Sequence, residues 1–142
     1  MKRIPEINVY VRYCETDAGG HVNNASYFLY FEEARTKFFA TLGFGPTERE
    51  HIHFIVARTE CDFIAQAYAG QILTVQTMVS KIGTKSYTVV HKITDAETGV
   101  SIAKGSAVIV CFNYQKQQSV PIPASLHATL EEYMQSVSVQ KG

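Results

Sequence analysis

Several parts of the chain alternate between apolar and polar residues with the period of two that is typical of β-strands. In the first of them, residues 7–12, the apolar residues Ile7, Val9 and Val11 predict a half-buried strand. Four later segments are rich in β-branched and aromatic residues: 54–64, 72–82, 85–94 and 101–113. Because short turns join the last three, we expect those strands to lie side by side and antiparallel.

Between the first two expected strands, residues 25–42 carry apolar residues at the spacing of a helix, and Gly43 ends the pattern. The polar face is narrow, and a helix of this kind is expected to be buried on nearly all sides. The main apolar stripe consists of Tyr27, Tyr30, Phe31, Ala34 and Phe38.

The order of elements is therefore one strand, one long apolar helix, four strands and a short helix over residues 124–136. A sheet that curls around the long helix would bury it. Gly105, inside the last strand, suggests a bulge or a bend over that helix. We predict an α+β fold with a five-stranded antiparallel sheet wrapped around one long central helix, in a single domain of residues 1–142.

Composition narrows the possible partners and compartments. The 142 residues include 13 Lys and Arg and 13 Asp and Glu, and this balance argues against nucleic acid or an anionic membrane as the main partner. The three cysteines, Cys14, Cys61 and Cys111, lie far apart and form no CxxC motif, which is typical of reduced thiols. No apolar run reaches the length of a membrane span, and the N-terminus lacks the apolar core of a signal peptide. We expect a cytoplasmic protein.

Residues 13–24, just before the long helix, contain two acids, a Gly-Gly pair, a His and an Asn-Asn pair. Gly19 and Gly20 permit backbone angles that other residues avoid and let another group approach the main chain closely. Asn23 and Asn24 favour a helix start, where unpaired N–H groups carry a partial positive charge. A carboxylate, a tight turn and a helix start could together polarise and attack a carbonyl. The same pattern also fits a well-capped helix entry with no chemistry.

The pattern Thr-Asp-Ala-x-Gly-His-Val-Asn-Asn-x-x-Tyr, residues 16–27, resembles the hotdog-fold acyl-CoA thioesterases of the 4-hydroxybenzoyl-CoA thioesterase type. The strand order and the Pro-containing tail extend the resemblance over nearly the whole chain. It implies hydrolysis of an acyl-CoA to a free acid and CoA, with coenzyme A present only as part of substrate and product. It also implies a homodimer or homotetramer whose active site lies between subunits.

The resemblance implies roles for residues of this segment. Asp17 would act as general base toward water or as nucleophile, and the backbone N–H at or next to Asn24 would polarise the thioester carbonyl. The turn at Gly19 and Gly20 would let the thioester come close, and Tyr27 would floor the acyl pocket. Many relatives have a polar side chain, often His, where this chain has Asn24. His21 is therefore open to two interpretations, a substrate contact or a hydrogen-bonding role in the core.

The phosphates of coenzyme A need cations or backbone donors. Relatives often place a basic, Gly-containing hairpin against the nucleotide, and the corresponding turn is 81–86, with Arg58 as the next cation. A solvated hairpin is the alternative interpretation. The residues expected to contact CoA in this turn are Lys81, Gly83, Thr84, Lys85 and Ser86.

Other patterns are weaker. His51-x-His53 lacks a third metal ligand nearby, and we expect no metal. Glu15 could be a second acid, but an exposed, non-catalytic Glu is the expectation. The first turn of the long helix has no acid, unlike related dehydratases. An acyl-carrier-protein thioesterase and a non-catalytic module that binds acyl-CoA remain alternatives, and acyl preference is not readable from the sequence.

Overall fold

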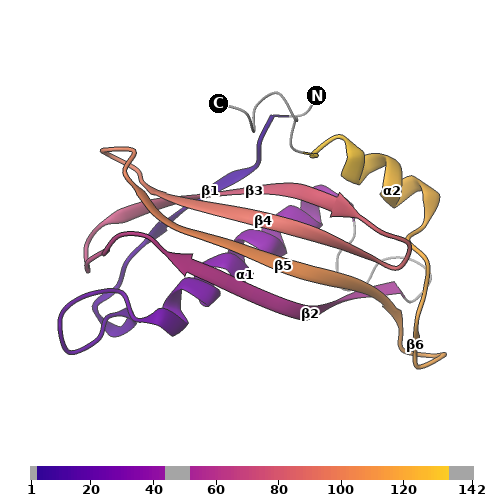
Figure 1. The fold of residues 1–142 in the computed structure, drawn as a ribbon, viewed down its shortest axis with the longest axis horizontal. Helices are drawn as coiled ribbons and strands as arrows, with labels where there is room; N and C mark the ends of the chain where they lie inside the picture. Colours follow the sequence, from indigo (N-terminus) through magenta and orange to yellow (C-terminus); the bar gives the residue numbers. More distant parts are fainter. Residues whose placement is uncertain (1–2, 44–51, 135–142) are drawn as a thin grey trace.

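The structure is a computed structural model that describes residues 3–43 and 52–134. One antiparallel sheet curls over a single long helix, α1 (Asn24–Thr41), as Figure 1 shows. A short helix, α2 (Ala124–Glu131), follows the last strand. The sheet has the order β1-β3-β4-β5-β2, and its long strands are β1 (Glu6–Tyr10), β2 (Ile52–Phe63), β3 (Ile72–Ile82), β4 (Ser86–Asp95) and β5 (Ser101–Asn113). The expected architecture is confirmed.

The strands follow the alternation of the sequence. In β3 the apolar side chains of Leu73, Val75 and Val79 are buried, and their neighbours face the other side of the sheet. The boundaries of β3 and β5 agree with the prediction, and β3, β4 and β5 are adjacent and antiparallel. The first strand ends earlier than expected, at Tyr10, because Tyr13–Glu15 form a 3₁₀ turn. A short strand that the pattern did not predict, β6 (Gln118–Ser119), pairs with the end of β5.

Gly105 lies beneath the long helix, but it does not produce the expected bulge. The register between β4 and β5 shifts at Ile93 and Thr94 instead, while His91 stands directly opposite Gly105. A Cβ atom on Gly105 would lie 2.4 Å from the ring of Phe31. The glycine therefore lets the helix approach the sheet closely, and the Phe31 ring stacks on the His91 imidazole at 5.1 Å.

The long helix is less buried than expected. Phe31 and Phe38 are almost fully buried against the sheet, but Leu29 on the opposite side is 56% exposed. The prediction of burial on nearly all sides is wrong for the single chain, because one curved sheet covers only one side of a helix. None of the described helices combines the length and apolar character needed to cross a lipid bilayer.

The two ends of the molecule carry different loops. Tyr10 pairs with Ile72, so the segment that leads into α1 lies beside the start of β3. The β3–β4 turn lies at the other end of the 11-residue β3, roughly 30 Å away at about 3.3 Å per residue. Figure 1 shows the same arrangement, with the β3–β4 turn near α2 and the loop that leads into α1 at the other end of the sheet.

Candidate functional site

Glu15 anchors the loop that precedes α1. Its side chain accepts hydrogen bonds of 2.9 Å from the backbone N–H of Arg12 and from the hydroxyl of Tyr30, and it forms an ion pair with the Arg12 guanidinium. Its carbonyl oxygen accepts from the Ser26 hydroxyl and from the Asn23 N–H. Glu15 is 9% exposed, so the expectation of an exposed side chain is wrong. The side chain is buried because it joins the 3₁₀ turn to the helix.

The charge on Glu15 is stabilised inside the fold. Burial raises the pKa of Glu15, but the hydrogen bonds from the Arg12 backbone and the Tyr30 hydroxyl outweigh it, so that the pKa is lowered. Burial and the hydrogen bond to Glu15 raise the pKa of Tyr30. Glu15 is thus an ionised structural group whose oxygens are occupied, and it is poorly placed to serve as a second catalytic acid.

Asp17 lies in a tight turn that closes on itself. Thr16 and Val22 form a β-bridge, and the Asp17 N–H donates to the His21 carbonyl at 2.8 Å. One carboxylate oxygen, Oδ1, accepts from the N–H groups of Gly19 at 2.9 Å and of His21 at 3.2 Å. Within the described residues the second oxygen has no hydrogen-bond donor. The turn therefore fixes the carboxylate through one oxygen and leaves the other available to a water or a carbonyl carbon.

Gly19 and Gly20 are required in this turn for different structural reasons. Gly20 has a φ of +82°, a left-handed conformation that favours glycine. A Cβ atom on Gly19 would lie 3.3 Å from Nδ1 of His21 and 3.4 Å from Oδ1 of Asp17. The first glycine thus gives room for the carboxylate and the imidazole, and the second allows the chain to turn.

The His21 ring packs edge-to-face on Tyr68, with ring centroids 5.0 Å apart. A β-bridge also joins these two residues, and the Val22 N–H donates to the Ala67 carbonyl at 2.8 Å. His21 is half-buried. Its observed contacts hold the turn against residues 67–68, and a contact with substrate stays a prediction.

The helix start lies where the Asn-Asn pair predicted it. Asn23 is the N-cap, and its side-chain oxygen accepts from the Ser26 N–H at 2.9 Å. The backbone N–H groups of Asn24 and Ala25 find no acceptor in the described parts of the chain. They face outward at the positive end of the helix dipole, and this end can bind a carbonyl oxygen that gains negative charge.

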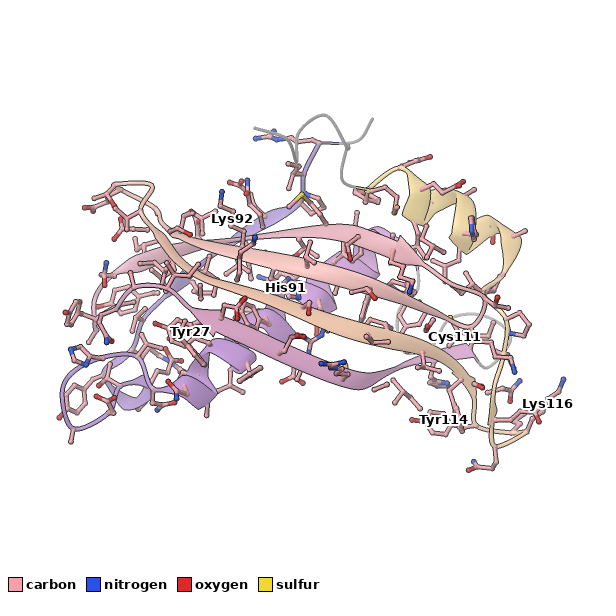
Figure 2. The ribbon with its side chains drawn as sticks, viewed as in Figure 1. Tyr27, His91, Lys92, Cys111, Tyr114 and Lys116 are labelled. Atoms are coloured by element: carbon pink, nitrogen blue, oxygen red, sulfur yellow. The ribbon has the colours of Figure 1, made fainter. Side chains whose placement is uncertain are left out.

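A pocket of about 180 Å³ opens at this helix start. Tyr27 is 3% exposed and forms part of its wall, and its ring lies 5.4 Å from that of Phe63 at the end of β2. Figure 2 shows Tyr27 at the end of the molecule that carries the loop, away from His91. Asp17 does not line the pocket. Val22 does, and its β-bridge with Thr16 closes the turn that holds Asp17. The lining residues are Val22, Asn24, Tyr27, Phe63, Ile64, Ala65 and Gln66.

Residues 63–66 were missed as part of the site. Phe63 and Ile64 end the predicted strand 54–64, and Ala65 and Gln66 follow it as an apparent loop without a chemical motif. The usable signal was Phe63, a large apolar residue at a strand end. It is 48% exposed in the single chain.

The structure does not bring the predicted CoA-binding residues to this pocket within one chain. Lys81 and Lys85 are exposed at the β3–β4 turn, at the opposite end of the sheet (Figure 1). The turn is closed by a 2.7 Å hydrogen bond from the Gly83 N–H to the Ser86 carbonyl, and the Thr84 carbonyl accepts from Ile122. Arg58 lies midway along β2 and pairs with Glu60 at 3.6 Å. Within one chain the β3–β4 turn and Asp17 therefore lie at opposite ends of β3.

No cluster of three metal-ligating side chains occurs in residues 3–43 and 52–134. The predicted weak pair includes His51, which lies outside the described residues. The ring of His53 packs edge-to-face on Tyr114 at 4.7 Å.

The model of the thioesterase-like superfamily matches residues 11–130. The acyl-CoA thioesterase YbgC of Haemophilus influenzae is 30% identical over 123 residues, which cover 84% of this chain and 89% of YbgC. The long-chain acyl-CoA thioesterase FadM of Escherichia coli is 25% identical over 128 residues, which cover 89% of this chain and 97% of FadM. The structure of a predicted thioesterase from Bacillus stearothermophilus matches with a TM-score of 0.84 at 31% identity, over 94% of this chain and 98% of that one. The chain therefore belongs to the thioesterase-like superfamily and is a thioester hydrolase with the hotdog fold.

Proposed function

We propose that the protein hydrolyses acyl-CoA to a free carboxylic acid and CoA. The observation that carries this proposal is the helix start at Asn24, whose unpaired N–H groups border a pocket next to the turn that holds the Asp17 carboxylate. Similarity to relatives that are named acyl-CoA thioesterases supports the substrate class.

In this mechanism the thioester carbonyl lies at the start of α1, and its oxygen accepts hydrogen bonds from the backbone of Asn24 or Ala25. Such donors contribute about 10²–10³ in rate, because they are already oriented when charge develops on the oxygen. Asp17 removes a proton from a water as its oxygen adds to the carbonyl carbon, or its carboxylate attacks that carbon directly. A general base contributes about 10²–10⁴. The carbon–sulfur bond then breaks, and CoA leaves as a thiolate that takes up the proton removed from the water. After a direct attack the acyl group stays on Asp17 as an anhydride, which a water hydrolyses to the free acid and the Asp17 carboxylate.

The acyl group occupies the pocket between Tyr27 and Phe63. Burial raises the pKa of Tyr27, so this wall of the pocket remains uncharged. Gly19 and Gly20 allow the thioester to approach the turn, and His21 borders the same turn. No cofactor takes part other than CoA itself.

The CoA moiety is held by a second subunit in a homodimer or homotetramer. Within one chain the β3–β4 turn and Asp17 lie at opposite ends of β3. A complete site therefore needs Lys81 and Lys85 from another chain. Gly83, Thr84 and Ser86 supply polar groups of the same turn, and Arg58 supplies a further cation on the open edge of β2. The reduced cysteines fit action in the cytoplasm.

Thiol release from a panel of acyl-CoAs of different chain length, aromatic acyl groups included, tests the function. We expect turnover of at least one member by the purified protein. Much faster release from acyl carrier protein than from CoA would identify the carrier protein as the substrate. Tight binding with no thiol release across the whole panel would contradict an enzymatic role.

A further inference from the structure

The loop that holds Asp17 is joined to α1 through one residue, Glu15. Among the residues that the structure describes, every hydrogen bond between residues 12–22 and α1 ends on Glu15. The Ser26 hydroxyl donates to its carbonyl oxygen and the Tyr30 hydroxyl donates to its carboxylate, both at 2.9 Å. These two hydrogen bonds therefore tie the Asp17 loop to the helix.

On its other side the loop is attached to the segment that precedes β3. The Val22 N–H donates to the Ala67 carbonyl at 2.8 Å, and His21 forms a β-bridge with Tyr68. These contacts do not involve α1. Without the contacts at Glu15 the turn would stay attached to this segment, but it could move relative to the helix start.

Both partners of the hydrogen bond between Tyr30 and Glu15 are held by further contacts. Tyr30 is 3% exposed, and its ring packs edge-to-face on Tyr27, with ring centroids 6.2 Å apart. The Glu15 carboxylate accepts from the Arg12 N–H and guanidinium, each at 2.9 Å. Burial and the hydrogen bond to Glu15 raise the pKa of Tyr30, so its hydroxyl keeps the proton that it donates. A hydrogen bond to an ionised acceptor is strong, and this one joins two fixed groups.

We propose that Glu15 and Tyr30 are positioning residues for the hydrolysis of the thioester. They hold the Asp17 carboxylate within reach of the carbonyl carbon while the carbonyl oxygen lies at the start of α1. Base and N–H donors come from different elements, and a misplacement of about 1 Å between reacting groups can cost about 10²-fold in rate. Neither residue touches the substrate in this role. The inference rests on the proposed function, in which Asp17 acts on the thioester.

Tyr30→Phe tests the positioning role, because it removes the hydroxyl and keeps the ring that packs on Tyr27. We expect kcat for thiol release to fall by about 10-fold to 10²-fold, with little change in KM, since the walls of the pocket remain. Tyr87→Phe is the matched control. The Tyr87 hydroxyl is also buried, but it has no hydrogen-bond partner among the described residues, so its loss should leave kcat unchanged.

A double variant separates positioning from a general loss of structure. Asp17→Asn has no carboxylate to position, so adding Tyr30→Phe to it should lower kcat little further. Independent effects would multiply instead. A wild-type kcat in Tyr30→Phe would overturn the proposal, as would a full multiplication of the two losses in the double variant.

Ser26→Ala provides a second test if Tyr30→Phe fails to fold. It removes the other hydrogen bond from α1 to Glu15 and should give the same fall in kcat with little change in KM. An impaired Asp17→Asn beside folded Tyr30→Phe or Ser26→Ala with the wild-type kcat would refute the positioning role alone. Absence of thiol release by the wild type would refute the proposed function and, with it, the positioning role.

Discussion

Two buried ionisable side chains show how single residues take opposite states in one core. Glu15 is ionised because Arg12 and Tyr30 donate hydrogen bonds to it. His91 is neutral because it is buried beside the Phe31 ring and the hydroxyl of Thr77, 3.0 Å from Nδ1, and its Nε2 has no hydrogen-bond partner among the described residues. A buried group is therefore charged or neutral according to the hydrogen-bond donors around it, here Arg12 and Tyr30 for Glu15.

The burial of His91 could be predicted from the sequence, but the burial of Glu15 could not. His91 stands in a strand at the same alternation as Tyr87, Val89 and Ile93, which face the core, so its burial followed from the pattern. Glu15 lies in a loop, and its burial depends on Tyr30, fifteen residues later in another element. Local patterns do not specify such a contact.

His91 predicts how stability depends on pH. Its pKa of about 3 in the fold lies below its ordinary value of 6.5, so the unfolded chain binds a proton that the folded protein rejects. This contribution to stability is complete above pH 6.5 and is lost as the pH falls, by roughly 1.4 kcal/mol per pH unit. In His91→Leu the free energy of unfolding should depend less on pH between 6.5 and 5. Urea titrations at several pH values measure it.

Glu15 does not affect the pH dependence between 6.5 and 5. Because its pKa in the fold is lowered, its contribution to stability is lost only when the pH falls below 4.5, the ordinary pKa of a glutamate. Parallel pH profiles of wild type and His91→Leu between pH 6.5 and 5 would contradict the assignment of a neutral, buried imidazole.

At the scale of elements, the contact between α1 and β5 decides how deeply the helix sits in the sheet. Gly105 is the position at which the Phe31 ring meets the strand. Local alternation predicted the strands, and apolar spacing predicted the helix. The position of β2 beside β5, far from its neighbours in sequence, could not be read from local patterns, since it depends on long-range pairing.

Gly105→Ala should destabilise the protein by about 1–3 kcal/mol, because its Cβ would lie 2.4 Å from the Phe31 ring and the helix would have to shift. The midpoint of urea denaturation measures the loss. Phe31→Leu added to Gly105→Ala should cost less than the sum of the two single changes, since the smaller side chain relieves the overlap. Simple additivity, or an unchanged midpoint in Gly105→Ala, would show that the contact is not close.

At the scale of the whole molecule, the sheet separates the two halves of the proposed site. The sequence alone offered Asp17 and the 81–86 turn as parts of one site, and only the register of β1 with β3 shows that one chain holds them at opposite ends. Spacing along a sequence carries no information on this distance. The pocket at Asn24 and the turn are therefore expected to belong to different subunits of one site.

Mixing variants tests this division. Lys81→Ala with Lys85→Ala should raise the KM for acyl-CoA with little change in kcat, because the cations hold the nucleotide and not the thioester. Asp17→Asn should lower turnover by about 10²-fold or more. When both chains are unfolded and refolded together, mixed dimers should contain one intact site, and activity with the KM of wild type should reappear. If the mixture shows only the KM of the double lysine variant, the turn does not act across subunits.

We propose that the Asp17 carboxylate carries out thioester hydrolysis. Asp17→Asn keeps an oxygen that can accept from Gly19 and His21 but removes the charge, so the turn should persist and thermal unfolding should hardly change. The most direct measurement is thiol release by Asp17→Asn beside Asp62→Asn, an exposed aspartate at the end of β2 that serves as control. We expect kcat to fall by about 10²-fold or more in Asp17→Asn and to stay near the wild-type value in Asp62→Asn. Turnover by folded Asp17→Asn at the wild-type rate would contradict the mechanism.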